Sequence, residues 1–426
     1  MLLAFSVENF KSIRDLQTLS MEAGGDDHLE ITNVFEAGRK RILKSAAVFG
    51  PYASGKSNVL DAMKWMNLFV QNSSKDTQVG EIIPVEPFVL STLTESAPTH
   101  FEIEFLLEEQ AFRYGFTATT QRVESEWLFR KSPTAKPTKL FTREGQKFSF
   151  TTANFREGKD LERRTRENAL FLSVCSQWNG PVATKVMAWF KQFRHISGIS
   201  DDAYFAFTAE RLQSPQHRKG LLGMAQQADF SIQSLRSELE ESQEPQGPLG
   251  RSNTNDEGTK ASKVTLARIK TTHAKRDGSD KDVGKVEFDL QEESKGTEKF
   301  IALSGPLTYT LETGSILVID ELEASLHRRL TQAIVDLFHS PLNQKNAQLI
   351  CATHDVTLLE PDRFRRDQIW FCEKSEAGAT DLYQLADFDS SQVRANSKFS
   401  RQYLLGLFGA VPQLAHFEEA VKSAFR

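Results

Sequence analysis

A glycine-rich stretch near the N-terminus has the spacing of a phosphate-binding loop. It reads Gly50, Pro51, Tyr52, Ala53, Ser54, Gly55, Lys56, Ser57, Asn58. The glycines let backbone N–H groups wrap a phosphate, the lysine supplies a charge for the outer phosphates, and the Ser57 hydroxyl is a ligand for Mg²⁺. A helix that starts at the loop points its positive end at the anion. The pattern predicts that this whole stretch binds a nucleotide.

Two carboxylates follow an apolar run in the last third of the chain. Residues 316–319 predict a buried strand, which ends in Asp320 and Glu321. Ligands of open α/β sheets bind at the carboxyl ends of the strands. Asp320 is suited to hold Mg²⁺, and Glu321 to orient or deprotonate an attacking water. The alternative is a pair of solvated carboxylates, and the phosphate loop in the same chain favours the functional interpretation.

A second buried run, residues 347–352, also ends in polar residues, among them His354. A histidine at this strand end is placed to donate to the γ-phosphate and to report its hydrolysis. A lone histidine is more often structural. One helix and one strand separate His354 from Asp320 and Glu321, and this order favours a functional role.

A fourth group stands ahead of an apolar helical pattern that includes Phe300 and Leu303. Ser294 and Gly296 precede this pattern, and a serine with a glycine at a helix N-terminus forms an anion site. The simpler alternative is an ordinary helix cap.

The elements expected around these residues define an α/β fold. The run 45–49 predicts a buried parallel strand that leads into the phosphate loop, and the residues after Ser57 have helical spacing. The segment 99–129 has the alternation of antiparallel strands, 155–240 is helical, and the last third alternates strand and helix up to a final hairpin. We expect residues 1–150 and 262–426 to form one domain, split by a mainly helical insertion over 151–261 with a flexible loop at about 240–262.

Composition excludes several classes of protein. The chain has 426 residues and a net charge of -5, which argues against bulk-charge coating of nucleic acid. The three cysteines form no CxxC pair, so neither a zinc knuckle nor a disulfide framework is indicated. The N-terminus has no signal peptide pattern, and no stretch approaches the roughly 20 apolar residues of a membrane span. We expect a cytoplasmic protein without a membrane partner.

The order of these motifs resembles the ATP-binding-cassette type of ATPase head. It is more similar to the branch with SMC, RecF and OLD-type proteins, to which the segment "VENFKSIRD" (7–15) also corresponds. Above all, it resembles the stand-alone AAA-type ATPases related to OLD, which occur in anti-phage systems such as AbiL, PARIS and Septu. The resemblance implies an ABC-type P-loop ATPase head with an antiparallel β lobe and a helical insertion.

The resemblance also implies roles for single residues. Asp320 and Glu321 match the pair that binds Mg²⁺ and activates water, and His354 matches the switch histidine. Ser294, Gly296 and Thr297 match the signature, which in such ATPases completes the site of the other subunit. ATP would then join two heads into a homodimer or higher homo-oligomer.

This sequence departs from its relatives at several positions. Tyr52 and Ala53 stand where many relatives carry asparagine and a small residue, and the signature reads Ser-Lys-Gly-Thr. No glutamine stands out as a Mg²⁺-contacting residue, although Gln71 and Gln78 are candidates.

Several functions fit a P-loop ATPase head. The first is a dimerising ATPase switch in phage defence that acts with a separate effector, a nuclease or toxin. The second is a DNA-repair ATPase of the RecF or SMC kind, but no long coiled coil is predicted. An OLD-type nuclease needs an additional metal-binding domain, for which the roughly 70 residues after His354 are too few. No guanine-binding motif is found, so ATP is preferred over GTP.

Overall fold

The computed structural model describes residues 1–76, 78–197, 202–243, 263–389 and 398–412, together with residues 421 and 425. The chain divides into two compact units. The first unit comprises Met1–His195, Thr310–Glu323 and Thr331–Arg426, and the second comprises Ile196–Tyr309 and Ala324–Leu330.

A six-stranded sheet of the first unit holds the strands that lead to the predicted site. Its order is β11-β15-β16-β5-β17-β18. Strands β15, β16, β5 and β17 are parallel, whereas β18 pairs antiparallel with β17 as the final hairpin. The bounds are β11 (Phe193–Ser197), β15 (Ile316–Asp320), β16 (Gln348–Ala352), β5 (Ser45–Phe49), β17 (Ile369–Lys374) and β18 (Thr380–Gln384). Both β5 and β16 are buried along their whole length, as strands covered on both faces must be.

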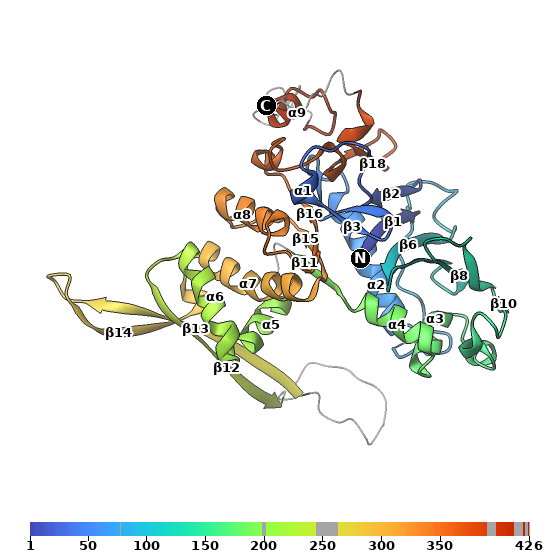
Figure 1. The fold of residues 1–426 in the computed structure, drawn as a ribbon, viewed down its shortest axis with the longest axis horizontal. Helices are drawn as coiled ribbons and strands as arrows, with labels where there is room; N and C mark the ends of the chain where they lie inside the picture. Colours follow the sequence, from blue (N-terminus) through green and yellow to red (C-terminus); the bar gives the residue numbers. More distant parts are fainter. Residues whose placement is uncertain are drawn as a thin grey trace. The chain divides into compact units, whose positions relative to one another are not determined.

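A second, seven-stranded sheet of this unit is antiparallel, with the order β10-β9-β8-β7-β6-β1-β2 (Figure 1). Its strands are β10 (Lys147–Phe150), β9 (Thr138–Glu144), β8 (Val123–Lys131), β7 (Gln110–Ala118), β6 (Thr99–Leu107), β1 (Leu2–Glu8) and β2 (Gln17–Ser20). Strand β6 alternates between buried and partly exposed residues, so one face of the sheet packs on the core.

Helix α2 (Lys56–Asn72) joins the two sheets through one hydrophobic core. Its residues Val59, Met63 and Met66 belong to the same buried cluster as residues of both sheets. The Trp65 ring stacks on Phe101 of β6 with 4.8 Å between ring centroids. Because α2 is fixed by this packing, its N-terminus is held rigidly at the end of β5.

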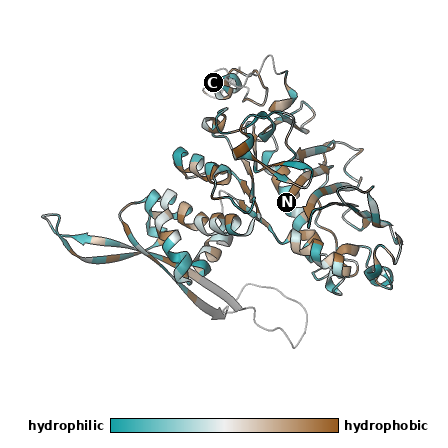
Figure 2. Cartoon of the chain, viewed as in Figure 1, coloured by the Kyte–Doolittle hydropathy of each residue, from teal (hydrophilic) through white to brown (hydrophobic). Residues whose placement is uncertain are grey.

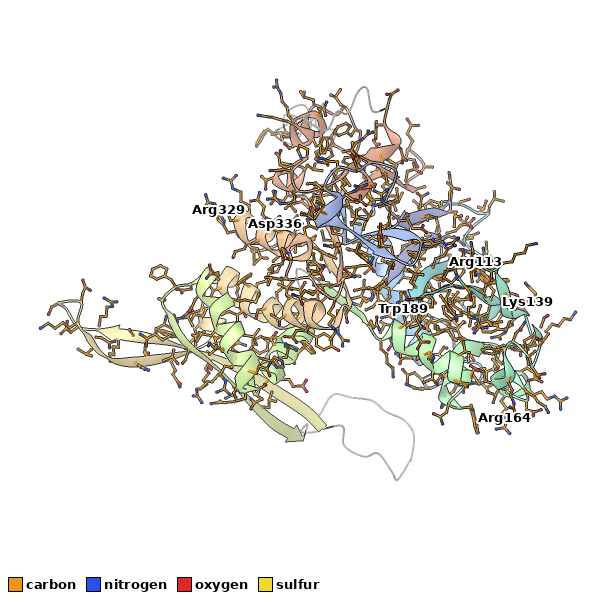
Figure 3. The ribbon with its side chains drawn as sticks, in the orientation of Figure 1. Arg113, Lys139, Arg164, Trp189, Arg329 and Asp336 are labelled. Atoms are coloured by element: carbon orange, nitrogen blue, oxygen red, sulfur yellow. The ribbon has the colours of Figure 1, made fainter. Side chains whose placement is uncertain are left out.

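Smaller elements complete the first unit. They are α1 (Glu30–Asn33), β3 (Val34–Ala37), β4 (Lys40–Leu43), α3 (Phe171–Gln177), α4 (Pro181–Phe190), α8 (Arg328–His339), which begins in the second unit, and α9 (Phe399–Leu404). Trp189 of α4, labelled in Figure 3, stacks on Phe105 of β6 with ring centroids 3.9 Å apart. Helices α3 and α4 therefore belong to the core of the first unit.

The second unit combines helices with a three-stranded antiparallel sheet of order β12-β13-β14. Its elements are α5 (Asp202–Leu212), α6 (Pro215–Ala228), β12 (Ile232–Gln243), β13 (Lys263–Arg276), β14 (Asp282–Asp289) and α7 (Lys295–Thr313), whose last residues enter the first unit. A separate buried cluster, which includes Leu212, Leu221 and Ile269, holds helices and sheet together. Figure 2 shows that the outer part of the β13–β14 hairpin is mostly hydrophilic.

The fold class expected from the sequence is confirmed, because a mixed α/β core with an antiparallel sheet is present. The compact units, however, divide the chain differently from the expected 151–261 insertion. The segment 155–195 packs into the first unit through α3 and α4, and β13 and β14 pair with β12 of the second unit instead of joining the head. Of the flexible loop expected at 240–262, residues 244–262 lie outside the described residues.

Candidate functional site

The phosphate loop follows directly from β5 and depends on its two glycines. Gly50 and Gly55 have φ values of 154° and 102°. A Cβ atom on Gly55 would lie 2.0 Å from Oγ1 of Thr380, and one on Gly50 would lie 2.3 Å from the Cys372 carbonyl oxygen. No side chain fits at either position, so the spacing seen in the sequence has a steric cause.

Lys56 begins α2 and is almost fully buried, with 6% of its surface exposed. Its Nζ donates to the carbonyl oxygens of Gly50 at 2.8 Å and of Pro51 at 3.0 Å. Burial lowers the pKa of Lys56, whereas nearby acidic groups, among them Asp320 and Glu321, oppose that shift. A buried ammonium group at a helix N-terminus is suited to bind a phosphate.

Asp320 ends β15 and lies next to the phosphate loop. Burial raises the pKa of Asp320, and a hydrogen bond from the Ser57 side chain opposes the shift. Its buried Oδ1 has no hydrogen-bond partner among the described residues. A hydroxyl and a carboxylate oxygen with an unused acceptor fit Mg²⁺, which prefers hard oxygen ligands.

Glu321 follows Asp320 with a φ of 51°, an uncommon value for a residue other than glycine. The strand ends here, and this backbone turn brings Glu321 to the cavity described below.

His354 follows β16 and is held from two sides. The Glu323 carboxylate accepts from the His354 backbone N–H at 2.6 Å and from the Thr353 hydroxyl at 2.7 Å. The imidazole ring packs against the ring of Tyr52, with 4.3 Å between centroids. Burial, followed by the charge of Lys56, lowers the pKa of His354, so the ring is neutral at neutral pH.

A cavity of about 330 Å³ brings most of the predicted residues together. It is lined by Tyr52, Ala53, Ser54, Gly55, Lys56, Ser57, Asn58, Glu321, His354 and Lys374. Asp320 is not among the lining residues, but it interacts with the side chain of Ser57, which is. Sequence reasoning missed Lys374 as a site residue, because only the pairing of β17 with β5 reveals that it lies beside the loop.

The signature residues lie in the second unit, at the start of α7. The Ser294 and Thr297 hydroxyls are 2.8 Å apart, and Ser294 Oγ accepts from the Thr297 backbone N–H at 3.2 Å. A Cβ atom on Gly296 would lie 2.9 Å from the Ser325 carbonyl oxygen. Within one chain the structure thus gathers the phosphate loop, Glu321 and His354 in one unit and places the signature in the other.

Neither candidate glutamine is among the residues that line the cavity. Gln71 donates from its side chain to Asn67 on α2, and the Gln78 carbonyl accepts from Asn168.

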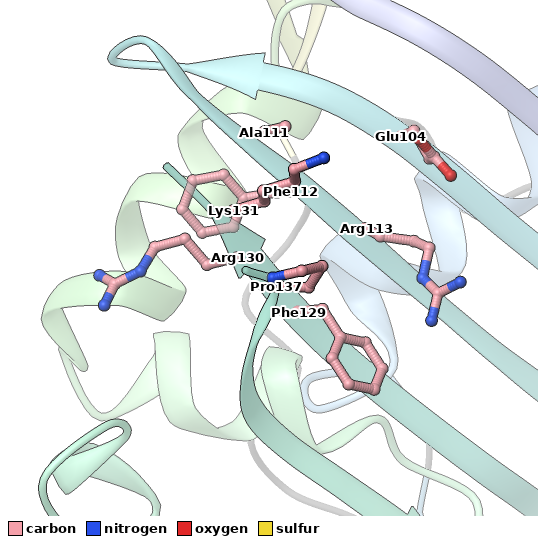
Figure 4. A pocket seen from close by; sticks show the side chains of 8 residues that line it. All are labelled: Glu104, Ala111, Phe112, Arg113, Phe129, Arg130, Lys131 and Pro137. Atoms are coloured by element: carbon pink, nitrogen blue, oxygen red, sulfur yellow. The ribbon is translucent and has the colours of Figure 1, made fainter. Parts of the chain in front are cut away.

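A smaller hollow lies on the antiparallel sheet (Figure 4). Its lining includes Arg113, Arg130 and Lys131 together with Glu104, and the Arg113 guanidinium lies 4.9 Å from the centre of the Phe129 ring. Arg130 and Lys131 have no ion-pair partner among the described residues. The hollow is therefore a local basic surface on a protein of net negative charge.

A family model described as "AAA domain, putative AbiEii toxin, Type IV TA system" matches residues 45–360, which contain the phosphate loop, the acidic pair and His354. The chain belongs to this family. Its AAA domain is that of a P-loop ATPase, as the phosphate loop predicted. A comparison with the curated proteins found no match.

Several solved structures are similar to the chain at low identity. The SMC head domain from Thermotoga maritima shares 14% identity, with 90% of this chain and 98% of that chain covered and a TM-score of 0.40. CbiO1 from Clostridium perfringens, part of an ABC transporter complex, shares 12%, with 98% and 100% covered and a TM-score of 0.32. The recombination mediator RecF shares 12%, with 90% and 98% covered and a TM-score of 0.30. These TM-scores are low, so the fold assignment depends on the strand order and the family.

Two further observations concern metals and membranes. Across the part of the chain that the structure describes, no group of three or more His, Cys, Asp or Glu side chains is placed to hold a metal ion. Over the same residues, no helix is both long and apolar enough to cross a membrane.

Proposed function

We propose that this ATPase is a Mg²⁺-dependent nucleotide switch that dimerises around ATP. The observation that supports it most is the cavity in which the phosphate loop meets Glu321 and His354. A catalytic carboxylate and a polar sensor beside a phosphate-binding loop are the parts that phosphoryl transfer to water requires.

Each side chain has a role in this mechanism. Lys56 and the loop N–H groups bind the β- and γ-phosphates, and Ser57 with Asp320 holds Mg²⁺, which supplies positive charge to the phosphate oxygens when bound. Glu321 orients the attacking water and accepts its proton. His354, neutral at neutral pH, donates a hydrogen bond to a γ-phosphate oxygen. Glu323 fixes the His354 backbone for that contact.

The signature supports a head-to-tail dimer. Ser294 is exposed, and it stands with Gly296 at the N-terminus of the long helix α7, where backbone N–H groups favour an anion. If these residues contact the γ-phosphate held by Lys56 of a partner subunit, neither subunit has a complete site alone. ATP then stabilises the dimer, and hydrolysis removes the contact.

The test is Glu321→Gln, which keeps the size of the side chain but removes the base. We expect ATP affinity to stay unchanged, turnover to fall by roughly 100-fold or more, and ATP-dependent dimers to accumulate in sizing experiments. Glu36→Gln, at an exposed position of β3, is the matched control. A Glu321→Gln protein that stays monomeric with ATP at micromolar concentration would contradict the dimer, and undiminished turnover would contradict the catalytic role.

We further propose that the switch acts in anti-phage defence through a separate effector, a nuclease or toxin. The family description, which refers to a putative toxin of a type IV TA system, supports a role in defence. The separate effector follows from the resemblance to ATPases of anti-phage systems. A pull-down with the Glu321→Gln protein tests it, because the ATP-bound form should retain the effector. Recovery of DNA-repair proteins instead would argue against defence.

DNA binding is the second candidate function, and the basic hollow on the antiparallel sheet favours it. Arg130 and Lys131 supply charge there, and Arg113, which pairs with Glu102 at 3.7 Å, supplies a planar surface together with Phe129. A DNA affinity that falls steeply with salt would support this candidate, and its absence at low salt would exclude it.

A further inference from the structure

Lys374 is a second cation in the nucleotide cavity, beside Lys56. It ends β17, its side chain is exposed, and it lines the cavity. Among the described residues, the Lys374 ammonium group has no hydrogen-bond or ion-pair partner. A lysine that lines an anion site without an internal partner is available to a ligand.

The backbone of Lys374 is anchored to the phosphate loop. Strand β17 runs parallel to β5 with Phe371 opposite Phe49, the residue before Gly50. Across the hairpin, Lys374 pairs with Thr380, whose hydroxyl donates to the Ser54 carbonyl oxygen at 2.9 Å. The Thr380 backbone N–H also donates to the Ser12 carbonyl oxygen at 2.7 Å. These hydrogen bonds of Thr380 therefore hold the backbone of its partner Lys374 beside the phosphate loop.

The end of β17 lies beside the phosphate loop, and the Lys374 side chain lines the nucleotide cavity. A Cβ atom on Gly50 would lie 2.3 Å from the carbonyl oxygen of Cys372, two residues before Lys374. Its ladder partner Thr380 contacts Ser54 and Gly55, where the loop passes into α2. Glu321 and His354, in contrast, come from the β15 and β16 ends.

The charges of the site also favour a second lysine. Asp320 and Glu321 contribute two negative charges to the site, and the nucleotide is itself an anion. Lys56 contributes only one positive charge. Lys374 balances the carboxylates, and the α2 N-terminus adds about half a positive charge.

We propose that the Lys374 ammonium group binds the α- and β-phosphates of the nucleotide, opposite the γ-phosphate end formed by Glu321 and His354. This inference assumes the ATP-binding function proposed above. It makes Lys374 a contact for ATP and ADP alike, whereas Glu321 and His354 distinguish the two.

The experiment measures ATP and ADP affinity by calorimetry for the wild type, Lys374→Ala and Lys374→Arg. We expect Lys374→Ala to weaken both nucleotides by roughly tenfold, to raise KM, and to change kcat little, while Lys374→Arg stays close to wild type. Lys374→Glu should weaken binding further. Lys147→Ala, at an exposed position of β10, is the matched control.

Three outcomes would overturn the inference. Unchanged affinities in Lys374→Ala and Lys374→Glu would show that the lysine does not touch the nucleotide. A loss for ATP with ADP unchanged would place it at the γ-phosphate instead. If the wild type itself binds no ATP, both the proposed function and the Lys374 contact are refuted. If the wild type binds ATP and the variants bind it equally well, only the Lys374 contact is refuted.

Discussion

The phosphate loop and the signature segment are both helix N-termini suited to an anion, but their surroundings differ. At the loop, the ends of β5, β15, β16 and β17 contribute side chains around the start of α2 and enclose a cavity. At the signature, the Ser294 and Thr297 hydroxyls contact each other, and Ser294 is exposed at the start of α7. The first region encloses a cavity of its own, whereas the second, according to the proposed dimer, meets a ligand that another subunit holds.

The largest expected effect comes from separating these two regions by mutation. Lys56→Ala removes the phosphate lysine but keeps the signature, and Ser294→Ala does the reverse. Each protein alone should lose turnover by roughly 100-fold, since each lacks one set of transition-state contacts. In an equal mixture, half of the dimers are mixed and have one working site of two, so about a quarter of wild-type turnover should return.

The measurement is phosphate release from the mixture against each protein alone. Two separately purified batches of Ser294→Ala, mixed with each other, are the control. If turnover does not recover, although the mixed dimers form, the signature does not act on a partner's nucleotide.

Glycine substitutions test the difference between the phosphate loop and the signature segment through their backbones. In Gly55→Ala the new Cβ would lie 2.0 Å from Thr380 Oγ1 at a φ of 102°, so we expect a loss of stability of about 1–3 kcal/mol and of ATP binding. In Gly296→Ala the Cβ would lie 2.9 Å from the Ser325 carbonyl oxygen. ATP binding should persist there, with turnover reduced.

Urea unfolding and ATP calorimetry measure both effects. Gly220→Ala on α6 is the control, since nothing lies within 4 Å of its Cβ and alanine should stabilise the helix by up to about 1 kcal/mol. Equal loss of ATP affinity in Gly55→Ala and Gly296→Ala would remove the distinction between the two regions.

The contrast also explains which parts of the molecule were predictable from the sequence. The loop, the Asp320–Glu321 strand end and the final hairpin depend on local spacing, which a single sequence displays. Lys374 and the Glu323–His354 hydrogen bond depend on which strands are neighbours, because β17 pairs with β5, far away in sequence. Likewise, the sequence showed the helical pattern of α3 and α4. It did not show that these helices pack on the antiparallel sheet, through contacts such as that of Trp189 with Phe105. Long-range pairing therefore determined what sequence reasoning missed.

Tyr52 was visible in the sequence as an unusual loop residue, but its neighbour His354 was revealed only by the structure. Of all these replacements, that of Tyr52 should change turnover least. The sequence shows only that it is bulky for a phosphate loop, whereas the structure shows its ring against the His354 ring, with 81% of the residue exposed. Such ring pairs contribute about 0.5–1.5 kcal/mol, so Tyr52→Ala should lower kcat by no more than about tenfold through a less ordered His354. Tyr52→Phe keeps the ring and should stay within about twofold of wild type. Steady-state kinetics distinguish the two variants. If kcat falls at constant KM in Tyr52→Ala but not in Tyr52→Phe, the Tyr52 ring acts by ordering His354. Equal effects of alanine and phenylalanine would instead assign the hydroxyl a role, and a change in dimerisation alone would place Tyr52 at the subunit interface.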